Sequence, residues 1–138
     1  GERALVPRAR VRVAWAAYAA GRSATSLATG AEVFCMAAVG GRLCCGLWSG
    51  DIQVCDRATL AEERRLAGHT RVVCGLAVWE GLVISGSSDR QIRVWDPATG
   101  RCEAILWGHA GGVSSLATCG SRLLSGSDDG TVRVWGMR

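Results

Sequence analysis

A repeat of 40 residues in the second half of the chain is the feature that most limits the folds it can adopt. The stretch from Ser85 to Asp96 reads SGSSDRQIRVWD, and 40 residues later the stretch from Ser125 to Gly136 reads SGSDDGTVRVWG. A Gly-His pair precedes each copy at the same distance, with its histidines at His69 and His109. Repetition at this spacing indicates a protein built from similar units that stack on one another.

The period continues backward into a third unit with a weaker signature. A shift of 40 residues places Cys55 at the position of Trp95 and Cys45 at the position of Ser85, while Thr29 replaces the histidine and Ser49 replaces Asp89. The apolar and turn residues of the unit are retained, namely Gly46, Ile52, Val54 and Asp56. We interpret this stretch as the same element without its polar signature.

Each unit has the pattern of four short strands. In the central unit we expect strands at 72–78 (VVCGLAV), 82–87 (LVISGS), 91–96 (QIRVWD) and 102–106 (CEAIL), separated by short turns. Pro97 and Gly100 mark the turn before the last strand, because proline is excluded from a central ladder. Four short antiparallel strands in about 40 residues are typical of one blade of a β-propeller.

The Gly-His pair, the S-G-S-x-D turn and the I-x-V-W-D strand resemble WD40 repeats. The resemblance implies an all-β fold, a β-propeller of four-stranded antiparallel blades, in an incomplete ring of about three blades plus a fragment. We expect a degenerate repeat at 28–67, a repeat at 68–107 and a repeat without its outer strand at 108–138. Residues 1–27 form a basic N-terminal segment that suits the last two strands of a preceding blade, although AWAAYAAG (14–21) equally suits a helix.

The repeated Ser, His and Asp raise two interpretations, a hydrolase triad or a structural bond network. Catalysis requires a nucleophile raised on a strained turn, whereas Ser85 and Ser125 lie inside apolar strands and occur at identical spacing in two units. The family resemblance implies structural tetrads instead, and we expect no catalytic residues and no enzyme activity. The two tetrads are His69, Ser85, Asp89 and Trp95, and His109, Ser125, Asp129 and Trp135.

The resemblance also implies where a partner binds, at the rim of the propeller channel. The corresponding residues here are Glu32, Phe34, Trp48, Val72, Cys74, Ser88, Gly112, Ser114 and Asp128. Phe34 and Trp48 either form a binding hot spot or cover the blade whose tetrad is lost, and the sequence leaves both readings open. For Trp79 and Trp107 we expect a packing role.

Composition restricts the other possibilities. Residues 1–22 hold five arginines and one acid, whereas the remainder carries eleven of each, so any affinity for RNA or anionic lipid would reside in this segment. A basic segment is more often a solvated tail, and we do not expect a nucleic-acid partner. The seven cysteines form no C-x-x-C pair, which predicts buried free thiols, no metal site and no cofactor. No apolar run is long enough to span a membrane.

The sequence therefore predicts an intracellular scaffold, cytoplasmic or nuclear, that binds a protein or peptide through its rim. A narrower alternative is substrate recognition within a ubiquitin ligase, and an alternative of another class is RNA or lipid binding through the first segment. Seven-bladed WD40 propellers need roughly 280–300 residues at this period. We therefore expect either self-association or further blades outside these 138 residues to complete the ring.

Overall fold

Three antiparallel sheets account for all the regular structure in the computed structural model, which describes residues 26–137. The strands are β1 (Val33–Val39), β2 (Arg42–Leu47), β3 (Ile52–Asp56), β4 (Glu62–Leu66), β5 (Val73–Trp79), β6 (Leu82–Ser87), β7 (Ile92–Trp95), β8 (Cys102–Leu106), β9 (Val113–Cys119), β10 (Arg122–Ser127) and β11 (Val132–Gly136). The expected all-β fold is confirmed. The predicted strands of residues 1–27 lie almost entirely outside the described part of the chain.

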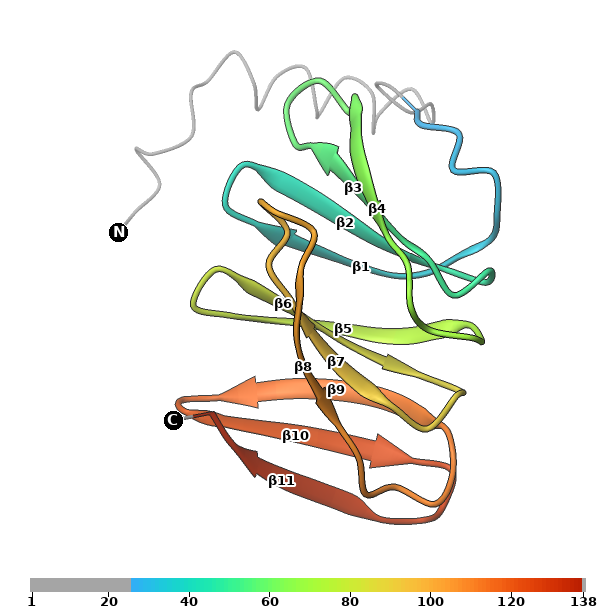
Figure 1. Cartoon of the computed structure of the whole chain (residues 1–138), viewed down its shortest axis with the longest axis vertical. Helices are drawn as coiled ribbons and strands as arrows, with labels where there is room; N and C mark the ends of the chain where they lie inside the picture. Colours follow the sequence, from blue (N-terminus) through green and yellow to red (C-terminus); the bar gives the residue numbers. More distant parts are fainter. Residues whose placement is uncertain (1–25, 138) are drawn as a thin grey trace, which may run out of the picture.

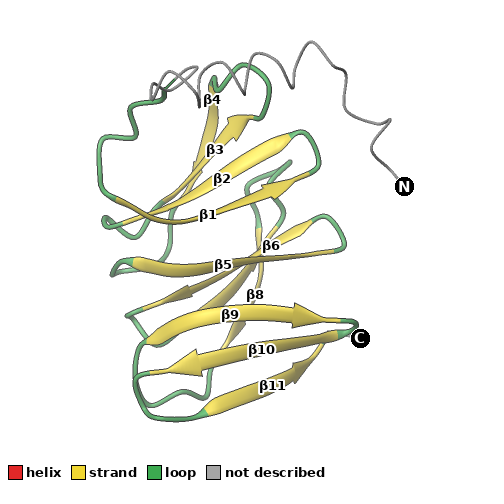
Figure 2. Ribbon diagram, turned by 180° about the vertical axis from the view of Figure 1, so that it is seen from behind, coloured by secondary structure: helices red, strands yellow, loops and turns green. Residues whose placement is uncertain are grey.

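The sheets are meanders stacked face to face, and we refer to them as the first blade (β1–β4), the second blade (β5–β8) and the third blade (β9–β11) (Figure 1). Each strand pairs with its neighbour in sequence, which short turns allow. Figure 2 shows the blades from behind, with β1, β5 and β9 above one another. The described chain is thus a segment of a propeller with sheets of four, four and three strands.

Two predicted strands are shorter or shifted because hydrogen bonds of the turns hold their end residues. The strand expected at 72–78 begins one residue later, since the carbonyl of Val72 accepts a hydrogen bond from the amide of Ser88 (3.2 Å). The strand expected at 91–96 runs only from Ile92 to Trp95. The amide of Gln91 donates to the carboxylate of Asp89 (2.9 Å), which keeps it in the turn.

Packing between blades requires glycine in the second strand of the first blade and in the second strand of the second blade. A Cβ atom on Gly86 would lie 2.6 Å from Cγ1 of Val113 in the third blade, and one on Gly46 would lie 2.8 Å from Cγ1 of Val73 in the second. The side chains of neighbouring blades then form two apolar clusters, one in each junction. This close approach explains the central glycine of the S-G-S motif.

Candidate functional site

The turns between the second and third strands of each blade lie together at one edge of the stack, beside the segments that enter the first strands (Figure 1). We call this edge the rim. The same backbone hydrogen bond recurs in each blade, from Trp48 to Glu32 (2.8 Å), from Ser88 to Val72 (3.2 Å) and from Asp128 to Gly112 (2.9 Å). The repeat thus fixes the backbone of the rim, and the side chains at these positions differ from blade to blade.

Below the rim, four side chains of the second blade form a continuous chain of hydrogen bonds. The indole Nε1–H of Trp95 donates to Oγ of Ser85 (2.8 Å), and that oxygen lies 2.7 Å from Nε2 of His69. Nδ1 of His69 lies 2.8 Å from Oδ2 of Asp89. The same carboxylate accepts from the amides of Thr70 (3.0 Å) and Gln91 (2.9 Å), which ties the entering loop to the turn.

The protonation of this network follows from its chemistry. Burial lowers the pKa of His69 below its ordinary value, although the hydrogen bond and charge of Asp89 act in the opposite direction. A neutral imidazole must place its proton on Nδ1, since the carboxylate of Asp89 can only accept. Nε2 then accepts the hydroxyl proton of Ser85. Every donor in the chain therefore points the same way, an arrangement in which hydrogen bonds reinforce each other.

Burial alone would raise the pKa of Asp89, but its hydrogen bonds from the backbone and from His69 outweigh burial and lower it. The third blade repeats the geometry. Trp135 Nε1 lies 2.9 Å from Ser125 Oγ, which lies 2.7 Å from His109 Nε2. Nδ1 of His109 lies 2.9 Å from Oδ2 of Asp129, whose pKa is lowered, foremost by the hydroxyl of Thr131. Both carboxylates are charged acceptors at neutral pH.

The glycine before each histidine also has a structural role. The guanidinium of Arg93 lies over the ring of Trp95, 5.8 Å from its centroid, and occupies the space that a Cβ atom on Gly68 would need. On Gly108 a Cβ atom would lie 2.9 Å from Nη1 of Arg133. Glycine at this position therefore lets an arginine cover the indole.

The connectivity Ser–His–Asp matches that of a hydrolase triad, but the surroundings of the serine do not. Ser85 has no exposed surface, and its oxygen is occupied by Trp95 and His69. A nucleophile must reach the substrate, and the oxygen of Ser85 cannot do so without unfolding of the blade. The bonds hold the third strand, the turn and the entering loop together, which is the chemistry of a structural clamp.

The first blade has no such network. Cys45 and Cys55 are buried at the positions of Ser85 and Trp95, and burial raises the pKa of both thiols. Thr29 instead donates to the carbonyl of Ala31 (2.6 Å), and no hydrogen bond within residues 26–137 joins it to either cysteine. Gln53, at the position of Arg93, is buried with its Oε1 lacking a hydrogen-bond partner.

The expectation of buried thiols is correct for only part of the set. Cys44, Cys45 and Cys55 are buried, and burial raises the pKa of Cys44 to about 12. Cys102 and Cys119 are exposed, at the first residue of the outer strand β8 and at the last residue of β9, where no element formed by residues 26–137 covers them. Among the described residues no cluster of His, Cys, Asp or Glu could hold a metal ion.

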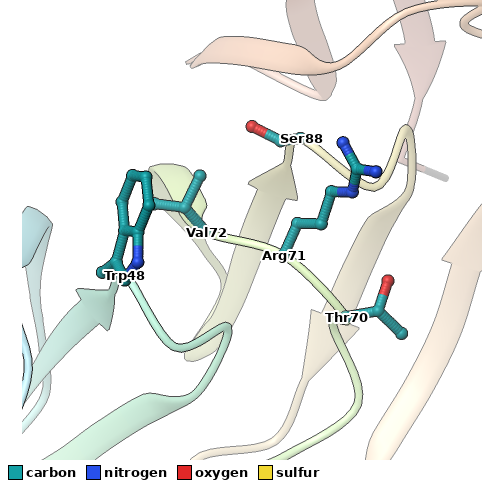
Figure 3. A pocket seen from close by; sticks show the side chains of 5 residues that line it. All are labelled: Trp48, Thr70, Arg71, Val72 and Ser88. Atoms are coloured by element: carbon teal, nitrogen blue, oxygen red, sulfur yellow. The ribbon is translucent and has the colours of Figure 1, made fainter.

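At the rim, the first and second blades enclose a pocket of about 360 Å³ (Figure 3). Three of the predicted rim residues line it, Trp48, Val72 and Ser88. Phe34 adjoins it through Trp48, with the two ring centroids 5.4 Å apart. The side chains of Phe34 and Trp48 remain 48% and 60% exposed, so they stack on each other and still present apolar surface to solvent.

The other predicted rim residues are distributed along the same edge. The thiol of Cys74 contacts the hydroxyl of Ser88 (3.4 Å), and Ser114 donates to the carbonyl of Gly126 (3.3 Å). Gly112 packs against Ser88 and Asp128 so closely that a Cβ atom would lie 3.0 Å from Cα of Ser88. The second and third blades therefore pack tightly at the position where the first and second blades leave a pocket.

Sequence reasoning missed two lining residues of this pocket, Thr70 and Arg71. The corresponding positions of the other blades hold small residues, and the pocket forms only where two repeats meet, so no motif marks it. The packing role expected for Trp107 is wrong: its side chain is 62% exposed beyond the end of the outer strand β8. Trp79 packs, partly buried, against the second apolar cluster.

Stacked four-stranded meanders with a repeated Trp–Ser–His–Asp network define a β-propeller repeat protein. Residues 61–96 and 100–136 match the family model described as WD domain, G-beta repeat. The chain belongs to this family. The match covers both intact tetrads and excludes most of the first blade, as expected from the loss of its polar signature.

Solved structures agree with this assignment. The computationally designed Ika4 protein is 32% identical, with a TM-score of 0.71 over 78% of this chain and 67% of that one. U3-55K is 30% identical, with a TM-score of 0.74 over 83% of this chain and 37% of its own. A chain of the Mitotic Checkpoint Complex is 26% identical, with a TM-score of 0.74 and coverage of 82% and 36%.

The chain therefore spans little more than a third of U3-55K and of the checkpoint-complex chain. The comparison with curated proteins finds no match. No helix within residues 26–137 is long and apolar enough to cross a membrane.

Proposed function

We propose that this chain is a protein-interaction scaffold that binds a peptide or protein segment at the rim of its first two blades. WD40 domains are generally such scaffolds, and the neighbour found in the Mitotic Checkpoint Complex belongs to a multiprotein assembly. The observation that carries the proposal is the stacked pair of Phe34 and Trp48 beside a pocket of about 360 Å³. Exposed aromatic anchors next to a pocket are typical of binding hot spots.

The alternative role of the two aromatic rings is to cover the first blade. The exposed fractions do not favour this covering role. Cys45 and Cys55 are buried, while Phe34 and Trp48 remain about half exposed. The rings therefore have apolar surface available for a partner.

The test is binding of an arrayed peptide library to the intact chain and to Trp48→Ala and Phe34→Ala. We expect both substitutions to abolish most binding and Trp107→Ala, an equally exposed tryptophan that does not line the pocket, to preserve it. Binding lost equally in all three variants would exclude the rim pocket. Equal urea midpoints of unfolding will show that the variants remain folded.

A second proposal concerns the outer face of the third blade, which we propose packs against a further blade, either in a second copy of the chain or in protein outside these 138 residues. Val132 is 71% exposed, whereas its counterpart Ile92 in the second blade is 1% exposed. Val134 is likewise 56% exposed and Val94 7%. Light scattering of the purified chain should show an oligomer that Val132→Glu disperses if a second copy supplies that blade. A monomer at every concentration would contradict pairing with a second copy and favour further blades outside these residues.

A narrower role is substrate recognition in a ubiquitin ligase located in the cytoplasm or nucleus. This role would use the same rim, and identification of the bound protein would test it. The other class, RNA or anionic-lipid binding, would use the arginine-rich segment that lies outside the described residues. It predicts binding that falls steeply with salt and disappears when residues 1–12 are removed. Rim binding predicts weak salt dependence and no effect of that truncation.

A further inference from the structure

The pocket between the first two blades has two chemically different ends. Trp48 and Val72 form an apolar wall on one side, and Arg71 extends toward Ser88 on the other (Figure 3). The guanidinium of Arg71 makes no ion pair or hydrogen bond with any residue in the range 26–137. A cation without a partner next to an aromatic wall is a place for an anionic group attached to an apolar one.

Comparison of the blades shows that only the second blade has a charged residue at the position of Arg71. Ala31 and Gly111 stand at the position of Arg71 in the other blades. A second arginine, Arg90, stands where they have Gly50 and Gly130, and it holds the positive φ of 76° that favours glycine.

Both arginines adjoin one serine. The hydroxyl of Ser87 donates to the carbonyl of Arg71 (3.0 Å), and the amide of Arg90 donates to the carbonyl of Ser87 (3.1 Å). The rim of the second blade therefore carries two positive charges in adjacent backbone segments. One of the two residues, Arg90, has a backbone conformation that is unfavourable for any residue with a side chain. Such strain is commonly found where a residue serves binding.

We propose that this pocket binds an acidic side chain of a partner peptide through Arg71, with a neighbouring apolar residue of the same peptide against Trp48 and Phe34. The proposal rests on the proposed function and adds the chemical class of its ligand. Of the two arginines only Arg71 lines the pocket, which suits the single charge of an aspartate or glutamate, whereas phosphate recognition commonly uses clusters of arginines.

The acidic residue of this rim segment reinforces the difference between the two ends of the pocket. The carbonyl of Glu32 accepts the amide hydrogen of Trp48 (2.8 Å), so this glutamate is adjacent to the aromatic end. Its charge disfavours an acidic residue there and favours one at the Arg71 end. The partner segment should therefore place its apolar residue at the Trp48 end of the pocket and its acid at the Arg71 end.

The experiment uses an array of heptapeptides that carry leucine or phenylalanine and, two or three residues to either side, glutamate, glutamine or phosphoserine. We expect the intact chain to retain the glutamate peptides in preference to the glutamine and phosphoserine peptides. Arg71→Ala should weaken their binding about tenfold, as expected for one charge-assisted hydrogen bond. Arg101→Ala removes the same charge from an exposed site in the β7–β8 turn and should leave binding unchanged.

Charge reversal distinguishes recognition from damage to the fold. Arg71→Glu should lose the glutamate peptides and gain peptides with lysine in their place, a change that misfolding cannot produce. Equal binding of glutamate and glutamine peptides, with Trp48→Ala still abolishing it, would overturn the acid preference and leave rim binding intact. Preference for phosphoserine over glutamate would overturn the carboxylate assignment. Absence of any bound peptide would overturn both proposals.

Discussion

The first and second blades share one backbone and differ in what holds it together. The strand pairing is the same, since Cys45 opposes Gln53 in the first blade as Ser85 opposes Arg93 in the second. In the second blade a chain of buried hydrogen bonds joins His69 and Trp95 through that serine. In the first blade, two thiols occupy the corresponding positions. The fold therefore does not require the tetrad in every blade.

The difference also changes the space around the sheet. A pocket of about 250 Å³ adjoins the first blade, lined by Thr29, Cys45 and residues of the neighbouring strands and loops. The second blade fills the matching region with an imidazole and an indole whose ring centroids are 6.3 Å apart. Small apolar residues tolerate substitution, whereas a polar network must stay complete. The first blade is thus free to vary at its rim, where Phe34 and Trp48 stand.

Removal of the central serine should give the largest effect. Ser85→Ala leaves the indole N–H of Trp95 and Nε2 of His69 buried without partners, at a cost of about 3 kcal/mol in unfolding free energy. Cys45→Ala removes only one buried sulfur and should cost about 1 kcal/mol. Urea unfolding of the two variants measures the contrast. Equal losses would mean that the tetrad contributes nothing beyond its packing.

The tryptophan of the third blade provides the next comparison. Trp135→Phe deprives Ser125 of its donor at 2.9 Å and should cost about 2 kcal/mol, since the serine oxygen remains buried. Cys55→Ala, at the same position of the first blade, breaks no hydrogen bond and should cost about 1 kcal/mol. Comparable shifts of the urea midpoint in the two variants would argue against the structural role of the tetrad.

Acid should weaken the second blade in two steps. The folded pKa of His69 is lowered by burial, so the unfolded chain binds a proton that the folded chain excludes, and stability falls as the pH drops below about 6.5. The folded pKa of Asp89 is also lowered, which adds a second loss below about pH 4. Urea midpoints from about pH 7.5 to about pH 2.5 measure both steps. His69→Gln should remove the contribution of His69 to the first step, and an unchanged profile would contradict its assignment.

The repeat predicted much of the fold and less of the site. The period of 40 placed the strands, because the first and second blades bury the same residues between neighbouring blades, Ile52 and Val54 in one and Ile92 and Val94 in the other. Arg71 gave no signal, since its function would come from a pocket shared with Trp48, a residue of the previous repeat. The exposure of Trp107 likewise depends on what lies beyond the outer strand. The repeat reveals only the residues that all units share, whereas the binding site depends on residues that occur in one unit alone.

The smallest effect is expected at Arg90, where the comparison with the other blades predicts a gain in stability. Its φ of 76° matches the values of 95° and 82° at Gly50 and Gly130, and a side chain in this region costs about 1 kcal/mol. Arg90→Gly should therefore stabilise the chain by about 0.5 kcal/mol, since the greater freedom of glycine in the unfolded chain offsets part of the gain. Gly130→Arg, in open space, should reverse the sign. Opposite shifts of the two urea midpoints would show that the second blade retains a charged side chain at the expense of stability, and a loss in both variants would mean that Arg90 holds its turn by contacts of its own.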